Sequence, residues 1–364
     1  MRKKRTMDQN NKTGKAADKN KKISWALLSA LIAVLTVWAV SRQWKGFSLR
    51  AMAQALSGAK PGWMLLAVAA MLGFIYFEGC AVRSACVALH YPTSRRRGFV
   101  YAAADIYFSA ITPSASGGQP ACMLMMRSFG VPGSVAAAVL MLTLTMYALS
   151  ILAVGLLVLL FAPSLFLRFS PPARVLIAAG TVIQIGLLAV FLLLMRSEGL
   201  FKRICLKLLD LLAKLRLLRN PERKKERLAQ TMDEYHRRAA LLTGHRPLLL
   251  RSFLYNLLQR VSAISVSMFV FLALGGDART APWIFAVQSC VVLGSNCVPI
   301  PGAMGVADYL MLDGFEAFLS PDRVVILELV SRSLSFYSCV LLCGLVVLFV
   351  TLRKRKVDRN DRLL

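Results

Sequence analysis

Histidine is scarce in this sequence of 364 residues, where it occurs only at positions 90, 236 and 245. All three positions fall in predicted loops, and no Cys/His spacing typical of a metal site accompanies them. No combination of serine, histidine and aspartate stands out, and no pair of catalytic carboxylates does either. The sequence therefore predicts no metal, no cofactor and no site for hydrolysis or group transfer.

Acidic residues are also few. The chain has 18 Asp and Glu against 45 Lys and Arg, which gives a formal net charge of +27. The basic residues collect before the first apolar run, within 196–246 and after residue 352. Such clusters beside membrane segments set orientation and attract anionic headgroups, so we expect the anionic inner leaflet as a partner. Nucleic-acid binding is disfavoured, because no basic soluble module with interleaved aromatic residues is present.

Apolar residues, by contrast, are abundant. They make up 57% of the chain, whereas ordinary soluble domains are about 45–50% apolar. The eight cysteines lie mostly within apolar runs without C-x-x-C spacing, so we interpret them as small core residues. The composition predicts an all-α polytopic membrane protein. Its full transmembrane helices are predicted at 23–40, 63–82, 135–161, 175–195, 248–274 and 324–352, lengths near the ~20 residues that cross a bilayer.

The charge distribution divides the chain into three parts. Residues 1–22 form a predicted basic cytoplasmic tail, 23–352 the transmembrane domain, and 353–364 a second basic cytoplasmic tail. The first apolar run is interpreted as an uncleaved signal anchor, because it is longer than the ~7–15 residues of a signal-peptide core. The stretch 196–246 is a predicted cytoplasmic loop, and its leucine spacing between 200 and 215 indicates a helix lying on the inner leaflet.

Two breaks rich in proline and glycine interrupt apolar sequence, at Ile111–Pro120 and Val298–Gly305. Proline and paired glycines unwind a helix. Unwound backbone at membrane depth is tolerated where protein buries it or where it lines a wet cavity, so such breaks mark candidate substrate sites. The 14-residue arm 98–111 reaches only about 21 Å, too short for a ~30 Å hydrocarbon core.

The alternation of basic loops fixes how the broken segments enter the membrane. Both ends of 98–127 are predicted on the cytoplasmic side, and both ends of 283–319 outside. The predicted fold is therefore six full transmembrane helices plus two re-entrant helical hairpins from opposite faces, an inverted-repeat-like outline. The alternative is a membrane scaffold in which the two breaks are hinges without a binding function.

The first hairpin supplies one group of candidate binding residues. They are polar side chains on one face of its first arm, together with the small and polar residues of its tip: Asp105, Thr112, Ser114, Ser116, Gly117, Gly118, Gln119 and Pro120. Exposed amides of the paired glycines at a helix N-terminus would suit a phosphate, and Arg127 would add a charged contact. Capping is the alternative role for the two serines, and snorkelling to the inner surface is the alternative for Arg127.

Charged residues in the later apolar segments form the second group. An ionisable residue inside a membrane costs about 2.5–3.5 kcal/mol, so each one needs a partner or a function. Asp308 makes the second hairpin too polar to face lipid. Glu328 and Arg332 stand four residues apart and could neutralise one another, or Arg332 could serve the substrate. Arg260 is a further candidate, and the sequence does not assign its partner.

The two breaks, with Arg332 in the last apolar run, resemble the lysylphosphatidylglycerol synthase transmembrane (flippase-like) family. The resemblance covers roughly residues 23–352. It matches Gly117, Gly118, Gln119 and Pro120 to the first family motif, and it matches Pro301, Gly302, Gly305 and Asp308 to the second. Many members carry an acid at the position of Gln119, and Glu is more usual than Asp308.

The resemblance implies a membrane unit that moves lipid between leaflets. Full-length members fuse it to a soluble synthetase domain, which we do not expect after residue 352. The expected function is thus a translocase for an anionic or aminoacylated phospholipid or a polyprenyl-phosphate-linked lipid, in a bacterial cytoplasmic membrane with both termini cytoplasmic. The alternatives are phosphatidylglycerol lysyltransferase activity, or a noncatalytic membrane partner of a separate synthetase or glycosyltransferase.

Overall fold

The computed structural model describes residues 57–112, 115–197, 221–296, 298, 300–303 and 305–360, together with six positions between 202 and 210. The predicted first transmembrane helix at 23–40, the tail 1–22 and Ser114 lie outside the described residues. So does most of the stretch 198–220, which contains the leucines predicted to form a surface helix. The architecture below concerns the described residues only.

Every regular element in the described part of the chain is helical, and five of the helices are long and apolar enough to cross a membrane. They are α3 (Pro61–Ala88), α6 (Gly133–Phe161), α8 (Pro171–Arg196), α11 (Arg246–Ala273) and the continuous run Pro321–Arg353. This run comprises α14 (Pro321–Arg332), a π-helical turn (Ser333–Ser338) and the start of α15 (Cys339–Asn360). The five helices confirm the five predicted spans that fall within the described residues.

Each predicted break separates two shorter helices. The first hairpin consists of α4 (Arg95–Ile111) and α5 (Gly118–Ser128), and the second of α12 (Ala281–Ser295) and α13 (Val306–Glu316). These helices contain 17, 11, 15 and 11 residues. At ~1.5 Å per residue none exceeds about 26 Å, so each is shorter than the ~30 Å hydrocarbon core of a bilayer.

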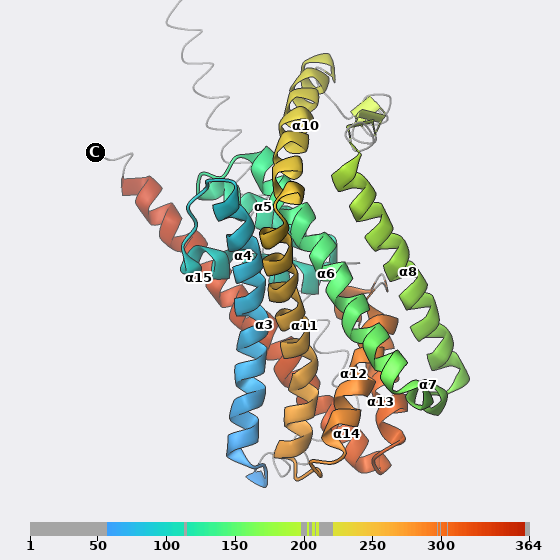
Figure 1. Cartoon of the computed structure of the whole chain (residues 1–364). Helices are drawn as coiled ribbons and strands as arrows, with labels where there is room; N and C mark the ends of the chain where they lie inside the picture. The colour runs from blue at the N-terminus through green and yellow to red at the C-terminus, as the bar shows by residue number, and fades with distance from the viewer. Residues whose placement is uncertain are drawn as a thin grey trace, which may run out of the picture. The chain divides into compact units, whose positions relative to one another are not determined.

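The two hairpins begin at opposite ends of the helix bundle. The first starts and finishes beside the end of α3 and the beginning of α6, whereas the second starts and finishes beside the end of α11 and the beginning of α14 (Figure 1). Their broken tips therefore point into the bundle from opposite ends. A short helix, α7 (Pro163–Arg168), joins α6 to α8 at the end where the second hairpin starts.

The first hairpin is held against α3 by close backbone contact. A Cβ atom added at Gly79 of α3 would lie 2.8 Å from the carbonyl carbon of Gly98 in α4. Because neither residue has a side chain, the two helices approach one another more closely than bulkier residues would allow. This crossing packs the start of the first hairpin directly against α3.

Helix α10 (Pro221–Gly244) lies in the stretch predicted to be a basic loop. Its apolar side packs against α6, and Tyr235 and Ala239 are fully buried there. The hydroxyl of Ser134 in α6 donates a hydrogen bond of 2.8 Å to Glu234. His236 belongs to this helix, so the predicted cytoplasmic connection contains regular structure.

Candidate functional site

A cavity of about 580 Å³ lies between the tips of the two hairpins. Residues of α3, α4, α5, α6, α8, α11, α12, α13, α14 and α15 line it, together with both tips and the π-helical turn. Six of the candidate residues predicted from the sequence line this cavity: Asp105, Ser116, Gln119, Arg260, Gly302 and Arg332. Residues from both halves of the chain are thus brought to one site.

The tip of the first hairpin is closed by its own hydrogen bonds. The hydroxyl of Thr112 accepts a hydrogen bond of 2.8 Å from the amide of Gly117 and donates one of 2.6 Å to the carbonyl of Phe108. The Gly117 amide is therefore engaged inside the tip, and Gly118 is buried. The prediction that both amides are exposed for a phosphate was wrong, because capping by Thr112 satisfies the first and packing covers the second.

Gly118 allows the two arms of the first hairpin to touch. A Cβ atom at this position would lie 2.1 Å from a carboxylate oxygen of Asp105 and 2.7 Å from its carbonyl oxygen. Such distances are well inside van der Waals contact, so only glycine fits. The role of this residue is to admit the Asp105 side chain against the start of α5.

Asp105 joins the two arms through its carboxyl group. One oxygen accepts a hydrogen bond of 2.8 Å from Nε2 of Gln119, and the other accepts one of 3.2 Å from the hydroxyl of Ser109. The side chain is buried at the cavity wall. Asp105 therefore fixes α5 to α4 from within the site.

A second polar cluster connects α3 to α11. Nε2 of Gln259 donates a hydrogen bond to the carboxyl of Glu78, and its Oε1 accepts one of 2.8 Å from Nε of Arg260. The Arg260 guanidinium lies 4.5 Å from the ring centre of Tyr147 and 5.4 Å from that of Phe74. These contacts are cation–π interactions, which hold the buried cation at the cavity wall.

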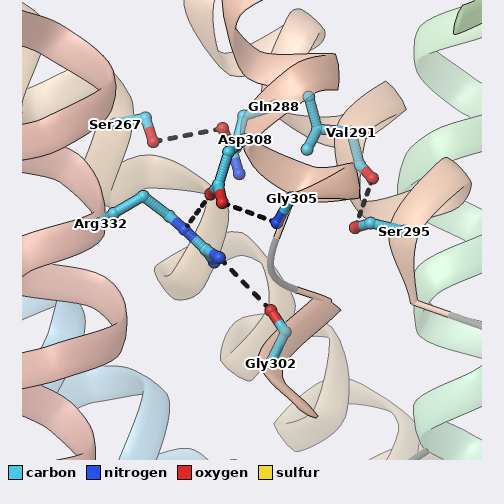
Figure 2. A network of polar contacts seen from close by, with 8 residues as sticks. All are labelled: Ser267, Gln288, Val291, Ser295, Gly302, Gly305, Asp308 and Arg332. Atoms are coloured by element: carbon cyan, nitrogen blue, oxygen red, sulfur yellow. Dashed lines mark hydrogen bonds and ion pairs between the residues drawn. The ribbon is translucent and has the colours of Figure 1, made fainter. Parts of the chain in front are cut away.

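The second tip is held by Arg332, as Figure 2 shows. Nε of Arg332 lies 2.7 Å from Oδ1 of Asp308, and its Nη2 donates a hydrogen bond of 3.4 Å to the carbonyl of Gly302 (Figure 2). The other oxygen of Asp308 accepts a hydrogen bond of 2.8 Å from the amide of Gly305. Gly302 and Gly305 have φ of +61° and +82°, left-handed conformations in which glycine is favoured. One arginine thus clamps both ends of the break.

The sequence suggested Glu328 as a partner of Arg332, but the ion pair is formed with a different carboxylate. The ion pair is with Asp308, on the second hairpin, while Glu328 lies buried one turn earlier on α14. The carboxyl of Glu328 also interacts with Asp308 and Arg332, but it is not part of the cavity lining. Pro301 and Gly302 begin a short 3₁₀ turn, Pro301–Ala303, at this tip.

A π-helical turn follows Arg332 directly. It spans Ser333–Ser338 and is closed by a hydrogen bond of 2.8 Å from the hydroxyl of Ser338 to the carbonyl of Ser333. Within this turn Ser335 lines the cavity, whereas Ser338 is exposed outside it. π-Helical turns inside α-helices occur often at functional sites.

Three residues that the sequence did not single out tie the second tip to the bundle. The hydroxyl of Tyr147 donates a hydrogen bond of 2.8 Å to Oδ1 of Asn296, and Nδ2 of Asn296 donates one of 3.1 Å to Oε1 of Gln184. All three residues line the cavity. The signal that could have found them is a polar side chain inside an otherwise apolar helix, as with Gln184 in α8.

Two candidates from the first hairpin lie away from the cavity. Arg127 is exposed in the last turn of α5, and Pro120 is exposed in its first turn. Neither contributes to the cavity lining. At the C-terminus of α5 the positive charge of Arg127 interacts favourably with the helix dipole. This position fits the alternative in which the side chain reaches the membrane surface.

The sequence comparisons agree with the helical architecture. Residues 25–343 match the model of the family described as the lysylphosphatidylglycerol synthase TM region. A "UPF0104 membrane protein" of Archaeoglobus fulgidus is 23% identical over 316 residues, which cover 83% of this chain and 91% of that protein. The family match includes both hairpins and every residue of the cavity. This multi-pass membrane protein therefore belongs to the lysylphosphatidylglycerol synthase TM region family.

Proposed function

We propose that this protein is a lipid translocase that moves an anionic or aminoacylated phospholipid, or a polyprenyl-phosphate-linked lipid, between the leaflets of a bacterial cytoplasmic membrane. The observation that carries this proposal is the cavity of about 580 Å³ between two broken hairpins, lined by Arg260 and Arg332. Small-molecule sites commonly enclose about 300–1,000 Å³. The cavity suits a polar headgroup, while the acyl chains would stay in the surrounding lipid.

The two arginines supply the chemistry that an anionic headgroup needs. A guanidinium presents a planar fork of donors that matches a phosphate, and it keeps its charge when buried. Arg260 is backed by aromatic rings, and Arg332 is oriented by Asp308. The carboxyl of Asp105 at the same cavity could accept the ammonium group of an aminoacylated headgroup. The cavity thus offers cations for the anionic group of the proposed lipids and a carboxyl group for an ammonium group.

The hairpins give this site a route to both leaflets. In the proposed orientation both termini are cytoplasmic, the first hairpin enters from the cytoplasmic face and the second from the outside. Displacement of one tip at a time would open the cavity alternately to each leaflet. The support for this mechanism is that the hairpins start at opposite ends of the bundle and meet at one cavity.

Leaflet exchange in reconstituted liposomes tests the proposal. Labelled phosphatidylglycerol, lysyl-phosphatidylglycerol and a polyprenyl phosphate would be compared with neutral phosphatidylcholine, in vesicles with and without the protein. We expect at least one of the three candidate lipids to exchange faster than in protein-free vesicles, and phosphatidylcholine to exchange at the protein-free rate. No acceleration of any candidate lipid by folded protein would refute the translocase.

Two alternative functions predict different results in parallel assays. A phosphatidylglycerol lysyltransferase would incorporate labelled lysine from charged tRNA into lipid. A noncatalytic partner would show neither transport nor incorporation, and would co-purify with a separate synthetase or glycosyltransferase. Either result in the absence of lipid exchange would replace the translocase proposal.

A further inference from the structure

Arg260 is a buried cation whose terminal nitrogens have no partner in the described part of the chain. The residue is 8% exposed and lies on α11 at the cavity wall. Its Nε donates a hydrogen bond of 2.8 Å to Oε1 of Gln259, but its two Nη atoms form no hydrogen bond or ion pair with the described residues. Neither Nη atom is sealed inside the protein, so both are open to the cavity. Because buried charges are normally paired, this arrangement indicates a site for an anionic ligand.

The surroundings of Arg260 fix its orientation. Its guanidinium lies 4.5 Å from the ring centre of Tyr147 and 5.4 Å from that of Phe74. The hydroxyl of Tyr147 donates a hydrogen bond of 2.8 Å to Asn296, so this ring is itself held in place. With Nε engaged by Gln259, the remaining edge of the guanidinium carries the two Nη atoms. This edge presents two donors side by side, which match two oxygens on one phosphorus atom.

Arg332 is the other cation that lines the cavity within the described residues, and its charge is already balanced. Its Nε lies 2.7 Å from Oδ1 of Asp308, and its Nη2 donates a hydrogen bond of 3.4 Å to the carbonyl of Gly302. The ion pair contributes little net charge to the cavity, although Arg332 can still donate hydrogen bonds there. Arg260 therefore supplies the positive charge that is not consumed by an ion pair.

Two carboxyl groups limit how much negative charge a ligand can carry. Glu78 and Asp105 both line the cavity. Nε2 of Gln259 donates a hydrogen bond to the carboxyl of Glu78, so the Gln259 amide lies between this carboxyl and Arg260. Asp105 accepts a hydrogen bond of 2.8 Å from Gln119. One negative charge on a ligand is matched by Arg260, whereas a second would face these carboxyl groups without a cation of its own.

We infer that Arg260 binds the headgroup phosphate and selects lipids whose phosphate is a diester. A phosphodiester carries one negative charge on two free oxygens, which the two Nη donors fit. A phosphomonoester has a second pKa of about 6, so it carries nearly two charges at pH 8. The inference rests on the proposed function for its choice of lipids. It narrows them to glycerophospholipids with an esterified headgroup phosphate and polyprenyl phosphates that bear a sugar.

Binding of two matched lipid pairs to the full chain in detergent at pH 8 tests the selectivity. The first pair is dihexanoyl-phosphatidylglycerol and dihexanoyl-phosphatidic acid, which differ in the glycerol that turns the phosphate into a diester. The second pair is a short-chain polyprenyl phosphate with and without one sugar. We expect the diester of at least one pair to bind at least about tenfold more tightly than its monoester in calorimetric titrations. The pair in which this occurs identifies the source of the phosphodiester.

A variant then tests whether Arg260 carries the selectivity. Arg260→Gln removes the charge and the paired donors, so binding of the diester should weaken at least about tenfold. Arg251→Ala, an exposed substitution on the same helix, is the matched control and should bind like the wild type. Unchanged diester binding by a folded Arg260→Gln protein would overturn the inference.

The wild type alone can also overturn the inference, whether or not the variant folds. It would do so by binding the monoester of each pair as tightly as the diester, or by binding neither diester.

Leaflet exchange of the same lipids separates this inference from the proposed function. Diester binding that depends on Arg260, without any exchange, would refute the translocase and leave the assignment of Arg260 intact. Exchange of phosphatidic acid as fast as that of phosphatidylglycerol would overturn the selectivity and leave the translocase intact. The two failures can therefore be told apart.

Discussion

Replacement of Arg332 by alanine is expected to slow lipid exchange by more than about 30-fold. The substitution removes the ion pair with Asp308 and the hydrogen bond to Gly302, so both ends of the second break lose their clamp. Truncation of one partner of a buried charge pair costs about 2–5 kcal/mol, and each ~1.4 kcal/mol is a factor of ten. The same substitution removes a cation from the cavity wall. Leaflet exchange in liposomes measures the loss.

A double variant separates the structural role of Arg332 from contact with a lipid. Arg332→Ala combined with Asp308→Ala removes both members of the ion pair, so thermal stability in detergent should recover toward the wild type. Exchange should remain slow, because the cavity still lacks the cation. Arg353→Ala, exposed further along the same run of helix, should behave like the wild type. Recovery of exchange in the double variant would show that Arg332 acts only through Asp308.

Substitution of Gly118 by alanine is expected to reduce exchange by more than about tenfold. The added Cβ would overlap a carboxylate oxygen of Asp105 at 2.1 Å and its carbonyl oxygen at 2.7 Å. A side chain can move, but the carbonyl belongs to the backbone of α4, so α5 itself must shift. Overpacking of this kind costs about 1–3 kcal/mol. The shift would break the hydrogen bond between Gln119 and Asp105 and distort the first tip.

The control for Gly118 is another glycine at the start of a helix. A Cβ at Gly133, in the first turn of α6, would lie 3.9 Å from Cδ of Arg127, which is an ordinary van der Waals contact. Gly133→Ala should therefore keep wild-type exchange and thermal stability. Full activity of Gly118→Ala beside this control would mean that close contact between α4 and α5 is not needed for transport.

The sequence was sufficient to predict the helices and the breaks because both depend on local properties. Apolar length determines which segments can cross a membrane, and the proline and glycine content of Ile111–Pro120 and Val298–Gly305 determines where helices stop. The observed helix boundaries differ from the predicted ones by a few residues. For example, α4 starts at Arg95 rather than at residue 98, because the hydroxyl of Ser94 accepts a hydrogen bond from the amide of Arg97 and caps the helix.

The partners of the site residues could not be predicted, because they come from distant parts of the chain. The i, i+4 spacing of Glu328 and Arg332 suggests a local pair, yet the ion pair reaches Asp308 on the neighbouring hairpin. The two glycines of the first tip suggested exposed amides. Thr112 engages the Gly117 amide, a contact that depends on the conformation of the turn rather than on composition.

The contacts of Tyr147 also depend on tertiary structure. Its hydroxyl meets Asn296, which is 149 positions away in the sequence, and its ring faces Arg260 of α11. Within α6 a tyrosine among apolar residues is compatible with a position at the lipid surface. Only the assembly of α6, α11 and α12 around one cavity shows that this side chain connects an arginine to the second tip.

The most direct test of passage through the cavity is to fill the cavity and measure lipid exchange. Ser335 lines it from the π-helical turn, and Ser335→Trp should stop exchange while Ser335→Ala leaves it near the wild-type rate. Leu345→Trp, on the same run of helix and 55% exposed outside the cavity, controls for the bulky substitution. Wild-type exchange by a folded Ser335→Trp protein would contradict a route between the two hairpin tips.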